Sequence, residues 1–430
     1  MRAMGSARIV EWVLAKPNSI YARRAWFFFE WLTGERLDLP DARTTAGVGP
    51  ALDPKRHVVT PGTLSPRHRI VDNLLGTPDL CPVVRRTPRL EEWGRIRMED
   101  RLQALIAGCD PALLARAVNY LYTKETRSSF EIERETPSLD RARRFVEALR
   151  HPQDLDLASE ADFVALQKTI VDPRYAAKGW RDFQNFVGGM AGGYRPEVDC
   201  VFPKPEDVPG LMRGLARLAG RVAGNQIEPV VAAALVAFAF VFIHPFEDGN
   251  GRIHRFLIHH VLTSSGLTPR GILFPVSACM VRNRRAYDAA LESVSNRLMP
   301  FVAYRWTEGD QGDVVVENDT LPLYRFFDAT ALAEYLYGCV DETIQKDFID
   351  ELAFLTVFDR VMAALKERVD MPDRRAGRFI QFCLQNGGRL SKAKRGAFSE
   401  LTDAEVADLE EVVRAASAGT GPATERSNRA

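Results

Sequence analysis

Twelve consecutive residues, 244–255, bring together several groups that suit phosphate chemistry, in the order His-Pro-Phe-Glu-Asp-Gly-Asn-Gly-Arg-Ile-His-Arg. Glycines on both sides of Asn250 let the backbone adopt positive φ and bring its N–H groups close to an anion. A helix that begins at this turn would add the unpaired N–H groups and the positive dipole end of its first turn. The pattern therefore predicts a binding site for a polyphosphate.

The side chains around this turn suit a reaction at phosphate. Arg252 and Arg255 lie three residues apart, so both can bind phosphate oxygens bidentately from the first turns of a helix. Asp248 is a hard oxygen ligand for a magnesium ion that already carries phosphate. His244 titrates near neutral pH and can take a proton from a hydroxyl. Either fragment alone, a Gly-Asn-Gly turn or a histidine at a helix end, is more often structural; their combination favours chemistry.

In this order and spacing, the stretch resembles the signature of the Fic family, His-x-Phe-x-acid-Gly-Asn-Gly-Arg-x-x-Arg, and every fixed position is filled. The resemblance implies an all-α helical bundle with one β-hairpin flap. It also implies transfer of AMP from ATP to a protein hydroxyl, with pyrophosphate released. His244 would be the base, Asp248 would hold Mg²⁺, and Phe246 would pack inward. The α-phosphate would lie on Gly249, Asn250 and Gly251, and the other phosphates on Arg252 and Arg255.

Two further segments carry the resemblance. Ser129-x-x-x-Glu133 is similar to the inhibitory-helix motif, whose glutamate pairs with the second motif arginine and blocks the γ-phosphate. The family usually has Gly or Asn next, and this chain has Arg134. Residues 284–291 resemble the helix whose tyrosine, here Tyr287, lies near the adenine; core packing accounts for that tyrosine equally well. The resemblance implies an autoinhibited enzyme.

A β-hairpin is predicted over residues 179–202, where two short β-prone runs flank a Gly-rich bend. It resembles the family's flap, which holds the target segment by strand addition. An ordinary surface hairpin is the alternative. The residues assigned to the flap are Asn185, Phe186, Val187, Gly188, Asp199, Cys200 and Val201.

Composition limits the class of protein. A length of 430 residues suits two or three domains. Acidic and basic residues number 57 each, so nothing global favours nucleic acid or anionic lipid. Six scattered cysteines favour a reducing compartment. Glu11 interrupts the one short N-terminal apolar run, and the apolar run 230–243 is too short for a bilayer, so cytoplasmic placement and no membrane contact are expected.

Helical periodicity outlines the remaining elements. An aromatic-rich helix is expected over 9–32, mostly ordered loop over 37–88 with short strands at 58–59 and 83–84, and helical spacing over 90–122. Ser128 with Glu131 forms a capping box, which predicts that a helix begins there. Basic residues among the aromatics of 9–32 could suggest nucleic acid, but a helix core face explains them better. The resemblance implies a Fic domain over 100–306, and the residues before it, 1–99, form an N-terminal accessory region.

Beyond the hairpin, helices are expected over 203–218, over 229–244 and from the motif to about residue 265. His254, His259 and His260 lack the spacing of a metal site. A polar stretch at 307–320 marks a boundary before a C-terminal helical region, 307–416. The tail, 417–430, is small and polar, and we expect it to be disordered.

Alternative functions stay open at this point. Within the same family, phosphorylation or hydrolytic removal of AMP are alternatives to AMP transfer. From a different class, the chain could be a nucleotide-binding regulatory protein without catalysis, whose N-terminal part contacts DNA or a partner. A binding-only protein needs neither a base nor a metal ligand, so His244 and Asp248 argue against it. The target protein, self-modification and homodimer formation are left open by the sequence.

Overall fold

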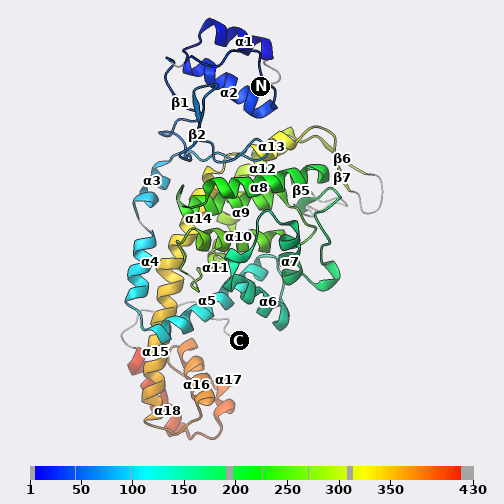
Figure 1. Cartoon of the computed structure of the whole chain (residues 1–430). Coiled ribbons are helices and arrows are strands. Elements are labelled where there is room, and N and C mark those ends of the chain that lie inside the picture. Colours follow the sequence, from blue (N-terminus) through cyan, green and yellow to red (C-terminus); the bar gives the residue numbers. More distant parts are fainter. Residues whose placement is uncertain are drawn as a thin grey trace. The chain divides into compact units, whose positions relative to one another are not determined.

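The computed structural model is mainly helical, with short strands that pair at three places in the described chain (Figure 1). Its helices confirm the expected all-α class. The chain divides into two compact units, of which the first holds Met1–Arg101 and Tyr122–Asp341 and the second Leu102–Leu121 and Glu342–Ala430. The boundaries expected at 99 and 306 stay predictions. The structure describes residues 5–43, 45–96, 98–189, 197–224, 226–269, 271–307 and 313–417.

The N-terminal part of unit 1 begins with two helices, so the single helix expected over 9–32 is wrong. Pro17 cannot continue the first helix, and Lys16 before it leaves the helical region with φ −137°. Ser19 then caps the second helix by accepting a hydrogen bond from the N–H of Ala22. The elements are α1 (Ser6–Ala15), α2 (Ile20–Thr33) and a sheet in the order β1-β3-β2, in which β1 (Gly49–Pro50) is parallel and β2 (Thr63–Ser65) antiparallel to β3 (Ile70–Asp72).

A buried arginine joins α2 to the loops around this sheet. Arg23 is 2% exposed, and its guanidinium donates to the carbonyls of His68 (3.1 Å), Arg69 (2.9 Å) and Gly47 (2.7 Å). The short strands expected at 58–59 and 83–84 are wrong, because this region forms only isolated bridges. Prolines recur on both sides of these valines and remove the donors that a longer ladder would need.

Five helices lead toward the motif, and one of them overturns the predicted helix start at Ser128. Ser128 lies in the last turns of a helix that begins at Pro111, where the Asp110 side chain accepts from the next free N–H groups. The capping-box pattern does not start a new helix here, because residues 128–131 already belong to the longer helix. These helices are α3 (Pro88–Arg95), α4 (Met98–Ala107), α5 (Pro111–Ile132), α6 (Leu139–Arg150) and α7 (Glu160–Ile170).

The centre of unit 1 is an apolar helix, α9 (Pro229–Ile243), whose side chains are nearly all buried. It packs against α8 (Val208–Val222) on one side and α10 (Asn250–Ser264) on the other, as Figure 1 shows. A helix that is apolar all round must be enclosed in this way, and Pro229 fits its first turn. The sequence predicted this helix and the one after it, and the structure confirms both. Two further helices, α11 (Val276–Arg282) and α12 (Arg284–Leu298), follow.

Two β-hairpins complete unit 1 in the described residues. The first, β4 (Phe186–Gly189) with β5 (Glu197–Val201), is the hairpin expected over 179–202. The second, β6 (Tyr304–Trp306) with β7 (Val314–Val316), was missed: β6 lies just before the polar boundary expected at 307–320, and β7 lies within it. Short 3₁₀ turns occur at Pro152–Asp154, Pro173–Tyr175, Pro205–Asp207 and Met299–Phe301, and the last helices are α13 (Leu321–Arg325) and α14 (Thr330–Glu342).

Unit 2 is helical and has its own core, in which Val361, Phe379 and Leu409 are fully buried. Its last helix continues to Ser417, so the expected disorder is wrong for that residue, and 418–430 lie outside the described residues. Besides its share of α4 and α5, the unit holds a π-helical turn (Thr343–Phe348), α15 (Ile349–Lys366), α16 (Asp373–Gln385), α17 (Lys392–Arg395), a 3₁₀ turn (Gly396–Phe398) and α18 (Asp403–Ser417).

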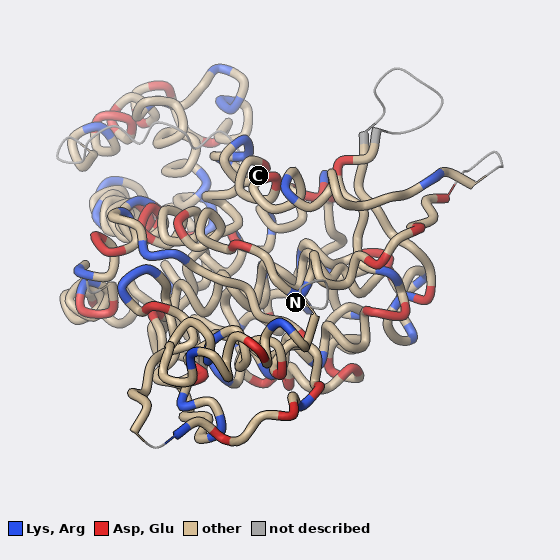
Figure 2. Tube along the Cα trace, turned by 90° about the horizontal axis from the view of Figure 1, so that it is seen from above, with Lys and Arg blue, Asp and Glu red and all other residues tan. Residues whose placement is uncertain are grey.

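Charge is distributed evenly along the trace. Lysines and arginines alternate with acidic residues through the described segments, without a long run of one sign (Figure 2). Within the ranges that the structure describes, none of the helices combines the length and apolar character that crossing a membrane requires.

Candidate active site

His244 ends α9 in the left-handed region, with φ 50° and ψ 59°. Its Nδ1 lies 3.1 Å from the carbonyl oxygen of Val241. Because a carbonyl only accepts, Nδ1 carries the proton, and Nε2 keeps its lone pair. The ring stacks on Phe202, with centroids 3.8 Å apart. Burial, with a further contribution from the charge of Arg181, lowers the pKa of His244 to about 4, so the imidazole is neutral at neutral pH.

The loop after His244 is held by the side chain of Asn250. Its Oδ1 accepts from the N–H of Phe246 (3.0 Å), and its Nδ2 donates to the carbonyl of Phe246 (2.8 Å). Phe246 is 1% exposed and packs against Trp180, as expected for an inward anchor. The Asn250 amide therefore fixes the loop, and the contribution of this residue to an anion site is its backbone N–H.

Two glycines make the start of α10 accessible to a ligand. Gly249 has φ 92°, which favours glycine, and α10 begins at the next residue. Gly251 lies in the first turn, where N–H groups have no partner within the helix. A Cβ at Gly251 would lie 2.2 Å from Oε1 of Glu133, so the Glu133 carboxylate rests directly on this backbone.

Glu133 reaches this point because α5 ends one residue before it. Its Oε1 accepts from Nη2 of Arg255 at 2.8 Å. Arg255 also donates from Nε to the Ser129 hydroxyl (2.9 Å) and from Nη2 to the Ser129 carbonyl (2.7 Å). Burial opposes ionisation of Glu133, but the charge and hydrogen bond of Arg255, together with the charges of Arg252 and Arg284, outweigh it and lower the pKa of the carboxyl. The structure thus brings the predicted residues Ser129, Glu133 and Arg255 together.

Arg255 is fully buried, yet one of its nitrogens has no hydrogen bond among the described residues. That nitrogen, Nη1, lies beside Gly251. An unpaired buried donor is costly, and an incoming anion would satisfy it.

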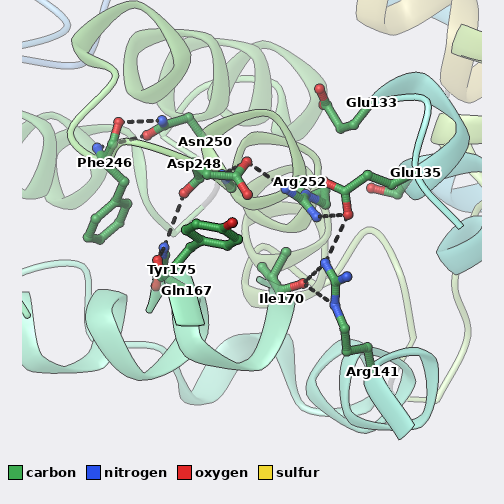
Figure 3. A network of polar contacts seen from close by, with 12 residues as sticks. Glu133, Glu135, Arg141, Gln167, Ile170, Tyr175, Phe246, Asp248, Asn250 and Arg252 are labelled. Atoms are coloured by element: carbon green, nitrogen blue, oxygen red, sulfur yellow. Dashed lines mark hydrogen bonds and ion pairs between the residues drawn. The ribbon is translucent and has the colours of Figure 1, made fainter. Parts of the chain in front are cut away.

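Arg252, the first motif arginine, is held by two carboxylates, as Figure 3 shows. Its Nη1 donates to Oε2 of Glu135 (2.9 Å), and its Nη2 donates to Oδ1 of Asp248 (2.7 Å). Arg141 donates to the same Glu135 oxygen (2.9 Å). The guanidinium carbons of Arg252 and Arg141 each lie 5.2 Å from the ring centre of Phe130. Sequence reasoning missed Glu135, whose only signal was a second acid two residues after Glu133.

Asp248, the predicted metal ligand, has a side chain that is 46% exposed. Its Oδ1 accepts from the Gly249 N–H (2.6 Å) as well as from Arg252. The described residues contain no group of three His, Cys, Asp or Glu that could hold a metal ion by themselves. A single exposed carboxylate suits Mg²⁺ that arrives on nucleotide phosphates, because this ion is usually bound through one or two carboxylates plus phosphate oxygens.

The other predicted residues have the following surroundings. Tyr287 is 4% exposed and lies between the rings of His254 and Tyr335, so core packing accounts for it and its contact with adenine stays a prediction. His259 pairs with Glu125, while His254 and His260 each lie within hydrogen-bond distance of a backbone carbonyl.

The hairpin lies at the same loop. Nδ2 of Asn185 donates to the carbonyl of Phe246 (3.3 Å). Strand β4 pairs with β5 through a register shift between Val187 and Gly188, and both of these residues are exposed. On β5, Asp199 is exposed, whereas Cys200 and Val201 are buried.

Residues 157–262 match the model of the Fic/DOC family. A probable protein adenylyltransferase of Aquifex aeolicus (strain VF5) is 24% identical over 298 residues, which are 64% of this chain and 83% of that protein. The protein adenylyltransferases Fic of Nematostella vectensis and Drosophila grimshawi are 29% and 33% identical over 41% and 25% of this chain. The alignments cover only 45% and 21% of those two animal proteins.

Among solved structures, a Fic family protein from Desulfovibrio desulfuricans G20 is similar with a TM-score of 0.44 and 18% sequence identity. That alignment covers 64% of this chain and 80% of the other.

Proposed function

Because this chain is a Fic family protein, we propose that it transfers AMP from ATP to a hydroxyl side chain of a protein and releases pyrophosphate. The observation that carries the proposal is the geometry between α9 and α10. A neutral histidine with a free Nε2 lone pair ends one helix, and the next helix begins six residues later, after a glycine turn. A base and an anion site are thus held by a single rigid loop.

The reaction assigns a role to each of these groups. Nε2 of His244 takes the proton of the target hydroxyl, whose oxygen attacks the α-phosphorus of ATP. The bond between the α-phosphorus and the oxygen bridging to the β-phosphate breaks, and pyrophosphate leaves with that electron pair. Backbone N–H groups of Asn250 and Gly251, with the helix dipole, stabilise the charge on the α-phosphate. The loop supplies mainly positioning and charge, which is what phosphoryl-type transfer requires.

Arg255 is proposed to bind the terminal phosphates. It is buried beside Gly251, in the cradle formed by the backbone of residues 249–251, and its Nη1 has no partner among the described residues. Asp248 and Glu135 hold Nη2 and Nη1 of Arg252, and its buried Nε has no partner among the described residues, so Arg252 is proposed to bind a phosphate as well.

Magnesium is the expected cofactor, and Asp248 would hold it. The ion would neutralise charge on the phosphates of bound ATP. Oδ1 of Asp248 is oriented by Gly249 and Arg252, so the carboxylate is fixed before a ligand arrives.

We expect Asp248→Ala to lose nearly all transfer activity, with little recovery at excess Mg²⁺, because the carboxylate sets where the metal lies. Initial rates across Mg²⁺ concentrations measure this, and Mn²⁺ binding in the presence of ATP, followed by electron paramagnetic resonance, gives a readout without turnover. Glu247→Ala is the matched control, an acid removed one position away. An unchanged Mg²⁺ dependence in Asp248→Ala together with a changed one in Glu247→Ala would assign the ligand to Glu247.

Glu133 is proposed to inhibit the enzyme. Its carboxylate occupies Nη2 of Arg255 and lies against Gly251, in the space that terminal phosphates would need. A third of its side chain remains exposed, so ligand has access to it. Arg134, which could have competed for the carboxylate, takes φ 57° two residues after the helix ends and has an exposed side chain. ATP would then bind with its α-phosphate displaced from the line of attack.

Labelled ATP separates the candidate functions. The protein is incubated with Mg²⁺ and ATP that carries label on either the α- or the γ-phosphate, with cell lysate as the source of target. AMP transfer labels protein from the α-position only. Label from the γ-position would indicate phosphorylation, release of AMP from a previously modified protein would indicate hydrolysis, and nucleotide binding without either would indicate a regulatory protein.

A further inference from the structure

We propose that Arg181 is a positioning residue that holds both ends of the β4–β5 hairpin against the backbone of His244. A target strand bound to the hairpin would then keep a constant position relative to the base. This inference rests on the proposed AMP transfer. Sequence reasoning missed Arg181, because its partners are backbone groups that no side-chain pattern reveals.

The guanidinium of Arg181 is 6% exposed and donates to three carbonyls. Nε donates to His244 (2.8 Å), Nη1 to Phe183 (2.6 Å) and Nη2 to Pro203 (2.6 Å). The backbone N–H of Arg181 also donates to Pro245 (2.9 Å). The three carbonyls accept from three different nitrogens of the arginine fork, a spread that the single nitrogen of a lysine ammonium does not cover.

The three carbonyls belong to separate parts of the site. Phe183 precedes β4, Pro203 follows β5, and His244 carries the base. Phe202 strengthens the link, because its N–H donates to the carbonyl of Asn185 (3.0 Å) while its ring stacks on the imidazole. A target strand that pairs with the hairpin would therefore be placed relative to Nε2 of His244 through Arg181.

The charge of Arg181 is buried without a carboxylate partner in the part of the chain that the structure describes. No carboxylate lies within ion-pair distance of it in the described residues, and burial lowers its pKa to about 10. It nevertheless stays charged at neutral pH. Three charged groups influence His244: the positive charge of Arg181 disfavours the imidazolium, while Glu133 and Asp248 favour it. The arginine thus also helps to keep the base in its neutral form.

Two variants of Arg181 separate the effect of its hydrogen-bond geometry from the effect of its charge. Two matched variants of Arg23 control for the loss of a buried arginine. Arg181→Lys keeps the charge and loses the fork, and Arg181→Gln loses both. The controls are Arg23→Lys and Arg23→Gln, since Arg23 is equally buried and also donates only to carbonyls, but in the N-terminal part. The readouts are ATP affinity, transfer rate against target concentration, and the pH–rate profile of the full-length protein.

We expect Arg181→Lys to lower kcat/KM for the target about 100-fold, the loss typical of a 1 Å misplacement, with ATP affinity within about twofold of wild type because Arg181 does not touch the cradle. Arg181→Gln should also move the acid limb of the pH–rate profile to higher pH, since the pKa of His244 rises when the positive charge is removed. The Arg23 variants should show neither change. Equal kcat/KM in Arg181→Lys and wild type would overturn the inference.

An exchange measurement keeps the inference testable apart from activity. The Phe202 amide, bonded to Asn185, should exchange with deuterium at least about tenfold faster in Arg181→Lys, because the ends of the hairpin lose their anchor. Unchanged exchange would overturn the inference about Arg181. The absence of AMP transfer by wild type would instead refute the proposed function, and the exchange measurement would still test Arg181.

If both Arg181 variants failed to fold, Phe202→Leu, which removes the stack on His244, should lower the transfer rate with ATP affinity retained. A wild-type transfer rate in Phe202→Leu would also count against the inference.

Discussion

His244→Ala should lower the rate of AMP transfer by about 10²–10⁴, the usual contribution of a general base, while ATP binding stays nearly intact. In the proposed reaction the imidazole acts on the target hydroxyl, and its Nδ1 and ring are occupied by Val241 and Phe202. The nucleotide would lie instead on the start of α10. Single-turnover transfer at saturating ATP measures the first effect, and nucleotide affinity measures the second.

His260→Ala is the matched control for this variant. It removes a buried imidazole of the motif helix, whose Nδ1 faces the carbonyl of Pro152. Its transfer rate should remain within a fewfold of wild type. A His244→Ala protein that modified its target at more than about a tenth of the wild-type rate would lack the loss expected of a base, and the proton acceptor would have to be sought elsewhere.

Glu133→Gly should raise the initial rate of AMP transfer roughly tenfold or more at saturating ATP. The variant removes the carboxylate from Nη2 of Arg255, which keeps its bond to the Ser129 carbonyl, and clears the space beside Gly251. Terminal phosphates could then bind without displacing the α-phosphate, and a displacement of about 1 Å costs about 100-fold in rate. Self-modification or modification of a lysate protein, measured as an initial rate, tests this.

Two controls isolate the carboxylate of Glu133. Glu131→Gly adds the same backbone freedom in the last turn of α5, where glycine costs about 1 kcal/mol, but leaves the pair with Arg255 in place. Glu135→Gln weakens the neighbouring pair with Arg252 instead. Activation by Glu133→Gly alone would identify the pair with Arg255 as the inhibitory contact. Equal rates in wild type and Glu133→Gly would leave that pair as a structural contact.

The sequence predicted best what is encoded locally. The end of α9, the turn and the start of α10 lie within one short stretch, where an apolar run, two glycines and a polar turn each determine the backbone directly. The pair of Glu133 with Arg255 spans 122 positions, and it was predicted only through a family resemblance.

The rest depended on tertiary contacts that no local pattern shows. Arg252 meets Glu135 across 117 positions, and Arg181 meets the carbonyl of His244 across 63. The cap at Ser128 was a valid local signal that a longer helix overrode. The β6–β7 hairpin was missed because its strands are three residues long each, too short for an alternating pattern to appear.

AMP transfer is tested most directly by the chemical identity of what becomes attached to protein. Glu133→Gly protein is incubated with ATP, Mg²⁺ and cell lysate, and modified peptides are sequenced by tandem mass spectrometry, with the Glu133→Gly, His244→Ala double variant in parallel. We predict one adenylyl group on a Thr, Ser or Tyr side chain, which the double variant does not produce. A phosphoryl group in its place, or an adenylyl group that forms equally well without His244, would contradict the account.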